Sequence, residues 1–194
     1  MELEQSPGDS EEDRLVARVA PAGPSPIFFP YEIRGETIVL LCHEVVRRAE
    51  KFPGKLIPLC MGSPGGSFFP AIFFWELVKD MGIRLDITAY GRVYSSALII
   101  LCAGERRRAS STTRFLLHPV FLKLPPAVTR GDLQREDDFA EADEDQLAKI
   151  VGSVTGQPVA RIIELMHQRT HLDAEGAKAL GIIQEVRQIV ARQP

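Results

Sequence analysis

The stretch that decides the fold is LDITAYGRVYSSALIILC, residues 85–102, in which an apolar strand pattern passes through a turn into a small, apolar helix pattern. We predict a strand at Leu85–Tyr90, a glycine-containing turn at residues 91–96 and a helix at Ser95–Cys102. A strand that leads directly into a helix is the repeating unit of α/β proteins. The stretch therefore predicts a largely parallel sheet covered by helices.

The sequence on either side continues this alternation. Apolar runs predict further strands, and apolar residues at helical spacing predict further helices. We expect strands at Ile27–Phe29, Lys55–Met61 and Arg114–His118 and helices at Thr37–Lys51, Phe68–Met81, Val159–His167 and Ala174–Leu180. Thr129–Val151 is acidic with a thin apolar stripe, which predicts a solvated helix, a partner-docking helix, or both. Glu105–Arg108 is interpreted as a solvated turn.

Length and composition limit the class of protein. The chain has 194 residues, 45% of them hydrophobic, and a net charge of −3 at pH 7. This suffices for one sizeable core, so we expect one domain at residues 26–194 behind a mobile, acidic and Pro-rich arm at residues 1–25. The charge predicts no nucleic-acid or membrane partner. The apolar runs are far shorter than the roughly 20 residues that span a bilayer.

The start of the chain and the cysteines indicate the compartment. An acidic start without an apolar run is the opposite of a signal peptide, so we expect a cytoplasmic protein. Cys42, Cys60 and Cys102 lie in apolar segments and are interpreted as reduced, buried thiols. His167 and His171 are four residues apart, but no further ligand pattern accompanies them, so we expect surface histidines and neither metal nor cofactor.

One glycine-rich turn, SPGGS at residues 63–67, joins a predicted strand to a predicted helix. Glycines allow the backbone to come close to a ligand, and N–H groups at such a turn can bind an oxyanion or a phosphate. Most such glycine pairs serve only a tight turn. A phosphate-binding loop would also need a lysine after its second glycine, which is absent here.

Ser95 lies in the second turn, at the beginning of a predicted helix. A serine there commonly caps the helix, and it can also be a nucleophile. His118 ends an apolar strand and so leaves the core. Imidazole accepts protons near neutral pH, as a serine nucleophile requires. Two turns, a serine and a strand-end histidine in this order favour a catalytic Ser95–His118 pair.

Three successive motifs resemble those of the Clp protease proteolytic subunit family: SPGGS at residues 63–67, GRVYSSA at residues 91–97 and RFLLH at residues 114–118. The similarity continues through Thr155–Gln157 and Ala174–Ile183 and covers roughly residues 27–187. The resemblance implies a crotonase-like α/β fold of repeated strand–helix units with a protruding handle strand and helix, at about residues 119–152. It also implies peptide-bond hydrolysis through an acyl-enzyme.

The resemblance also assigns roles by position. Ser95 matches the nucleophile, His118 the general base, and the backbone N–H groups of Gly66 and Ser96 the oxyanion-hole donors. It implies a homo- or hetero-oligomeric ring that encloses its sites and cleaves peptide or unfolded-protein substrates. The family's N-terminal segment lines the axial pore, and the Pro-rich arm here departs from it, which argues against docking of an AAA+ unfoldase.

The family has a catalytic triad of serine, histidine and aspartate. The resemblance fails at its third member, because Arg169 occupies the position of the aspartate. Another acid could take its role, such as Asp173, Glu164 or one from the acidic helix. The site could instead be a Ser–His dyad with a polar or water orienter. The chain could also be a weak or inactive structural subunit of a mixed ring. An acyl-CoA enzyme of the crotonase superfamily is disfavoured by the Ser–His pair.

Three aromatic residues also depart from the family pattern. Tyr94 precedes the serine where a small residue is usual, and Phe68 and Phe69 follow the first turn where smaller residues are common. Such residues either narrow the substrate pocket or pack in the core.

Overall fold

A computed structural model describes residues 23–121 and 127–189 of the protein. The predicted arm at residues 1–25 lies almost entirely outside the described residues and stays a prediction. Residues 122–126, in the first part of the predicted handle, also lie outside them.

The chain alternates strands and helices almost throughout, as the sequence predicts. In chain order the elements are β1 (Ile27–Phe29), α2 (Gly35–Lys51), β2 (Ile57–Ser63), α3 (Phe68–Asp80), β3 (Leu85–Tyr94), α4 (Ala97–Cys102), β4 (Arg106–Ser110), β5 (Arg114–Leu116), α5 (Arg130–Thr155), α6 (Val159–His167), β6 (His171–Leu172), α7 (Ala174–Leu180) and β7 (Glu185–Arg187).

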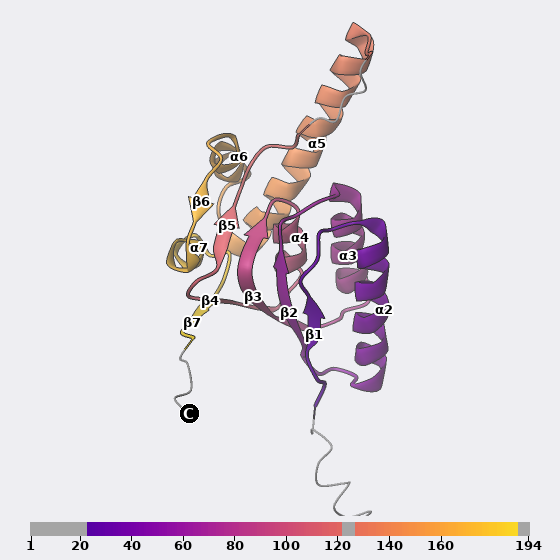
Figure 1. Ribbon diagram of the computed structural model, residues 1–194, viewed down its shortest axis with the longest axis vertical. Coiled ribbons are helices and arrows are strands. Elements are labelled where there is room, and N and C mark those ends of the chain that lie inside the picture. The colour runs from indigo at the N-terminus through magenta and orange to yellow at the C-terminus, as the bar shows by residue number, and fades with distance from the viewer. Residues whose placement is uncertain (1–22, 122–126, 190–194) are drawn as a thin grey trace, which may run out of the picture.

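Parallel pairing orders five strands as β1-β2-β3-β4-β7 (Figure 1). β5 also pairs in parallel with β3, at residues 92–94, beyond the stretch at residues 86–89 that pairs with β4. β4 and β5 therefore follow one another along the same edge of β3. β6 adds an antiparallel pair to β5. The predicted α/β class with a largely parallel sheet is confirmed.

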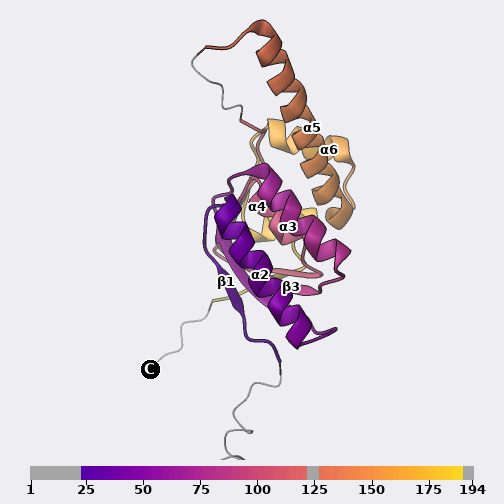
Figure 2. The same cartoon turned by 90° about the vertical axis from the view of Figure 1, so that its right-hand side faces the viewer.

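Helices α2 and α3 lie side by side against the sheet near β1 and β2 (Figures 1 and 2). All six residues of α4 are buried, which explains why this short helix consists of small and aliphatic residues. The second half of α5 packs on α4 and α6 and buries Leu147, Ile150 and Val151. The hydrophobic core therefore lies between the sheet and the helices, where burial of apolar surface stabilises the domain.

The first half of α5 projects beyond the rest of the domain (Figures 1 and 2). Thr129 is its N-cap, because the Thr129 Oγ1 accepts a hydrogen bond from the Asp132 N–H and the Asp132 carboxylate accepts one from the Thr129 N–H. Ala140 is the first buried residue of the helix. The exposed residues of this acidic helix are thus concentrated in its projecting half, which leaves both the solvated and the partner-docking interpretation open.

The predicted turn at Glu105–Arg108 is wrong, because Arg106–Ser110 forms β4. The arginine run suggests solvent, but side chains alternate across a strand and Arg107 points inward with 7% exposure. Its guanidinium donates to the carbonyls of Gly104 and Ile182, each at 2.9 Å. Burial lowers the pKa of Arg107 from its ordinary value.

The predicted end of the third strand at Tyr90 is also wrong. β3 continues to Tyr94 through an irregularity, in which its residues 90–92 face the single residue Gly62 of β2. Gly91 has a φ of 67°, a left-handed conformation that glycine adopts easily. The glycine therefore marks a bulge within the strand, and the turn is confined to Ser95 and Ser96.

The cysteines are free, as expected, but they differ in burial. Cys42 and Cys102 are buried, whereas Cys60 is half-buried. Desolvation raises the pKa of the Cys42 thiol to about 11 and that of Cys102 to about 12. In residues 23–121 and 127–189, no helix has the length and apolar character needed to cross a membrane.

Candidate active site

Two neighbouring parallel strands bring Ser95 and His118 to the same end of the sheet. Tyr94, the last residue of β3, pairs with Leu116, the last residue of β5. The Ser95 N–H continues this pairing by donating to the Leu116 carbonyl at 2.9 Å. Because the carboxyl ends of parallel strands share one edge of a sheet, the residues that follow β3 and β5 meet there.

Ser95 occupies a sharp strand-to-helix turn. Its φ is 57°, a left-handed conformation that costs a non-glycine residue about 1–3 kcal/mol and is concentrated at functional sites. The same geometry exposes the serine of a nucleophile elbow. Ser96, not Ser95, is the N-cap of α4, and no side-chain hydrogen bond caps the helix. Of the two serines in this turn that could cap the helix, Ser96 thus holds the cap position.

The glycine turn predicted at residues 63–67 packs directly against the Ser95 turn. A Cβ atom on Gly65 would lie 2.6 Å from the Tyr94 carbonyl oxygen and 2.9 Å from the Ser95 Cβ. A Cβ atom on Gly66, whose φ is 144°, would lie 2.2 Å from the Ile33 carbonyl oxygen. Both distances are too short for any side chain, so this close approach of three backbone segments requires glycine.

One side-chain hydrogen bond connects the two turns. The Ser96 hydroxyl donates to the Gly66 carbonyl at 3.0 Å. Within the described residues, neither the Gly66 N–H nor the Ser96 N–H has a hydrogen-bond partner. Both residues line the same pocket, so two donors are available there for the oxygen of a ligand.

His118 is half-buried, and its imidazole is held by its neighbours in the chain. Nδ1 lies 2.5 Å from the carbonyl oxygen of Pro119. Because a carbonyl oxygen can only accept, this contact assigns the proton of the neutral imidazole to Nδ1 and leaves Nε2 as an acceptor. The ring also stacks on Phe121, with 4.7 Å between centroids and an interplanar angle of 23°.

Ser95, His118, Gly66 and Ser96, the four residues predicted for the site, all line one pocket of about 490 Å³. No hydrogen bond joins the Ser95 hydroxyl to His118 among the described residues, although catalytic hydrogen bonds often form only when substrate is bound. The pocket walls include Phe68, Phe69 and Phe121. The arrangement combines a hydroxyl, a base and two N–H donors on an apolar wall.

The Clp protease family model matches residues 22–190 of the chain. This chain belongs to the Clp protease family. The ATP-dependent Clp protease proteolytic subunit 1 of Prochlorococcus marinus (strain NATL2A) is 31% identical over 140 residues, which are 69% of this chain and 68% of that protein. Subunit 3 of Rhodococcus jostii (strain RHA1) is 27% identical over 150 residues, 75% of this chain and 72% of that protein.

The fold of this Clp family member is also that of a solved relative. A ClpP1 mutant from Listeria monocytogenes superposes with a TM-score of 0.74, at 18% identity, over 84% of this chain and 91% of that chain. The repeated strand–helix units and the crotonase-like fold expected from the three motifs are thereby confirmed.

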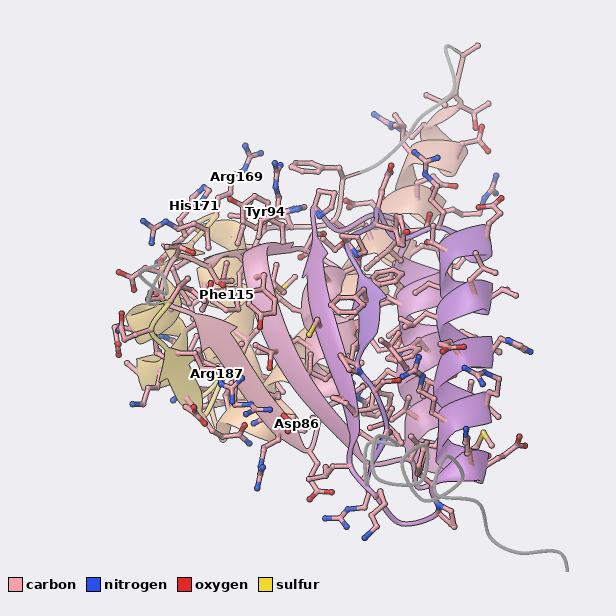
Figure 3. All side chains as sticks on the ribbon, turned by 60° about the horizontal axis from the view of Figure 1, so that its bottom comes forward. Asp86, Tyr94, Phe115, Arg169, His171 and Arg187 are labelled. Atoms are coloured by element: carbon pink, nitrogen blue, oxygen red, sulfur yellow. The ribbon has the colours of Figure 1, made fainter. Side chains whose placement is uncertain are left out.

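Arg169, at the position of the family's aspartate, forms no hydrogen bond with His118 within the described residues of this Clp family member. Its φ is 51°, and its guanidinium carbon lies 5.4 Å from the centroid of the Phe121 ring. Figure 3 shows Arg169, Tyr94 and His171 at one end of the sheet and Asp86 and Arg187 at the other. Arg169 and His118 therefore share Phe121 as a neighbour.

The two acids named from the sequence as substitutes have other partners. Glu164 accepts hydrogen bonds from Arg161 and Gln168 on the surface of α6. Asp173 accepts the Gly176 N–H and caps α7. Within the described residues, neither one has a hydrogen bond to His118.

The acidic helix supplies a carboxylate that no sequence pattern singled out. Glu144 on α5 is largely buried, with 13% of its side chain exposed. Its Oε1 accepts the Val120 N–H at 2.8 Å, and its Oε2 lies 3.0 Å from Nε2 of His167. The contacts join residues 23 and 24 positions apart, which no local pattern reveals.

Two further expectations concern the aromatic residues and the histidines. Phe68 and Phe69 line the pocket, whereas Tyr94 packs edge-on against His171 at 6.3 Å between ring centroids.

The two histidines that are four residues apart have different partners. His167 contacts Glu144, and His171 contacts Tyr94. In the part of the chain that the structure describes, no group of three His, Cys, Asp or Glu side chains is arranged to hold a metal ion.

Proposed function

We propose that this Clp family member is a serine peptidase that cleaves peptide bonds through an acyl-enzyme on Ser95, with His118 as the general base. The observation that carries the proposal is the 2.5 Å contact of His118 Nδ1 with the Pro119 carbonyl oxygen. It leaves Nε2 free to accept a proton, which is the state that a base for serine requires.

In the proposed reaction, the Ser95 hydroxyl oxygen attacks the scissile carbonyl carbon and its proton passes to Nε2 of His118. The imidazolium then gives this proton to the leaving amine, and the peptide bond breaks. Water, activated by the same histidine, hydrolyses the resulting ester and releases Ser95. These reaction steps require no cofactor.

The Pro119 carbonyl performs part of the work of the missing aspartate. The triad acid fixes the histidine tautomer and stabilises the imidazolium, and its replacement by an amide that imposes the wrong tautomer costs ~10⁴ in kcat. A carbonyl oxygen imposes the right tautomer, because it can only accept. It carries no full charge, so its stabilisation of the imidazolium is weaker.

The backbone N–H groups of Gly66 and Ser96 are proposed as the oxyanion hole. They are unpaired within the described residues, and both residues line the pocket that contains Ser95. Negative charge that develops on the substrate oxygen would be stabilised by both donors. Removing one such donor typically costs ~10²–10³ in kcat.

The substrate is proposed to be a peptide or an unfolded protein segment with apolar side chains, because Phe68, Phe69 and Phe121 line the pocket. The matched relatives are named proteolytic subunits, which supports a homo- or hetero-oligomeric ring. Their names also say ATP-dependent, but residues 1–25 differ from the family's pore-lining segment. We therefore propose a cytoplasmic peptidase core that hydrolyses peptides without ATP and would gain processive proteolysis only with a partner AAA+ unfoldase.

The test is hydrolysis of fluorogenic peptides with apolar side chains by the assembled full-length protein. Wild type, Ser95→Ala and His118→Ala are compared with Ser67→Ala, a matched control whose serine also lines the pocket. We expect turnover by wild type and Ser67→Ala and its loss in the other two variants.

Absence of turnover by every variant would contradict the proposal. It would favour the alternative that the chain is a structural or regulatory subunit of a mixed ring, for which the arginine at position 169 is the supporting observation.

A further inference from the structure

We propose that Glu144 is the acid of this site and acts on His118 through the peptide bond between Pro119 and Val120. This inference rests on the proposed function and adds a positioning residue to it. The carbonyl of that peptide accepts from His118 Nδ1 at 2.5 Å, and its N–H donates to Glu144 Oε1 at 2.8 Å. One peptide unit therefore joins the imidazole to a carboxylate.

The peptide unit transmits both geometry and charge. Its six atoms lie close to a plane, so an anchored Val120 N–H also fixes the direction of the Pro119 carbonyl. Hydrogen bonds in a chain polarise one another, and a carboxylate that accepts from the N–H increases the negative charge on the carbonyl oxygen. A more negative oxygen binds the imidazolium more strongly than an isolated carbonyl does.

The surroundings of Glu144 support this role. Only 13% of its side chain is exposed, which reduces screening by water. Its second oxygen is 3.0 Å from Nε2 of His167, so contacts to both oxygens hold the carboxylate in place. Leu147, one turn further along α5, lines the pocket, and so does Val120. The helix therefore reaches the catalytic pocket at this point.

Other charged groups near His118 and Glu144 come from several elements. Glu32 lines the pocket from the segment after β1. Arg169, after α6, lies over Phe121, which stacks on His118. Arg169 forms no ion pair with Glu144 in the described residues. The second carboxylate oxygen has its close contact with Nε2 of His167, at 3.0 Å.

We call this connection from Glu144 through the Pro119–Val120 peptide unit to His118 the relay. Three substitutions test it. Glu144→Gln keeps an oxygen that can accept the Val120 N–H but removes the charge, whereas Glu144→Ala removes both. Asp145→Asn is the matched control, since Asp145 is a neighbouring carboxylate whose salt bridge, at 2.5 Å, is to Lys149 on the surface. Thermal unfolding of each variant monitors the fold.

The first readout is the rate at which a fluorophosphonate labels Ser95 in the assembled full-length protein, measured across pH. At metal sites, loss of a residue that orients a ligand typically costs ~10–100-fold, and we take this range as the scale for a positioning residue. We expect about a 10-fold loss for Glu144→Gln and about a 100-fold loss for Glu144→Ala, with Asp145→Asn unchanged. The midpoint of the pH profile should fall in Glu144→Gln, because the imidazolium loses stabilisation.

The second readout is the Nδ1 proton resonance of His118 in ¹⁵N-histidine-labelled protein, assigned by its absence in His118→Ala. We expect an upfield shift in Glu144→Gln and no shift in Asp145→Asn. This resonance needs no turnover, so it tests the relay even if wild type is not labelled, an outcome that would overturn the proposed function alone. An unchanged resonance and pH midpoint in Glu144→Gln, or equal changes in Asp145→Asn, would overturn the relay.

Discussion

His118 donates its Nδ1 proton to the backbone carbonyl of the next residue, Pro119, at 2.5 Å. This relationship answers the question that the arginine at position 169 raises, because a histidine base needs an acceptor at Nδ1 and that acceptor need not be a side chain. We therefore propose a serine–histidine pair with a peptide carbonyl as its orienter.

Restoring the family's acid by Arg169→Asp should change peptidase activity by less than about 3-fold. The Nδ1 proton of His118 already has an acceptor, and the Arg169 side chain lies against Phe121, on which His118 stacks. The comparison is with Arg169→Gln, which removes the cation without adding an acid. A tenfold or greater rise in Arg169→Asp alone would mean that the missing acid limits the enzyme.

Gly66→Ala should abolish peptide hydrolysis and lower the melting temperature markedly. A Cβ atom there would lie 2.2 Å from the Ile33 carbonyl oxygen, and the φ of 144° is nearly closed to other residues. Gly54→Ala is the matched control, since Gly54 has a φ of 71° and open space around it. Differential scanning calorimetry of both variants checks this, and equal melting temperatures would contradict the requirement for close approach.

Ser96→Ala should slow peptide hydrolysis about 10-fold while the domain stays folded. It removes the 3.0 Å hydrogen bond that fastens the Gly66 carbonyl, and such a bond contributes about 1 kcal/mol. The Gly66 N–H, on the same turn, would lose its fixed direction toward the substrate oxygen. The kcat of Ser96→Ala relative to Ser67→Ala is the measurement, and equal values would show that the connection between the turns is unimportant.

The cysteines should differ in reactivity toward iodoacetamide. Desolvation raises the pKa of Cys42 to about 11 and that of Cys102 to about 12, so both stay protonated and unreactive at pH 8. Cys60, half-buried and with a pKa also raised, should be alkylated first. The ordinary pKa of a thiol is 9.0, below the raised pKa values of Cys42 and Cys102. Ionisation of these two thiols in the unfolded chain should therefore lower the free energy of unfolding as the pH rises above 9. Peptide mapping after alkylation checks the order, and early modification of Cys102 would contradict it.

The sequence predicts the elements that are long or strongly patterned. Val159–His167 and Ala174–Leu180 have the predicted bounds, because helical spacing and a following turn define both ends. β6 and β7 were not predicted, since two or three residues are too few for a periodicity. Arg107 shows the limit of charge as a signal, because its guanidinium is buried against carbonyls rather than solvated.

The sequence likewise pointed to some residues of the candidate site and not to others. Ser95, His118 and the glycines of SPGGS were identified because strand ends and turns are local features of the chain. The orienter of His118 was missed because a backbone carbonyl leaves no trace in residue types. An acid from the acidic helix was one expectation, but Glu144 could not be singled out, because its contact with Val120 spans 24 residues and many acids of the same helix have the same local pattern.

The most direct test of the central claim is fluorophosphonate labelling of the assembled wild-type protein, with the modified residue identified by peptide mapping. We expect one modified serine, Ser95. Labelling should be abolished in Ser95→Ala and strongly slowed in His118→Ala. Labelling that persists in Ser95→Ala, or that proceeds at the wild-type rate in His118→Ala, would contradict it.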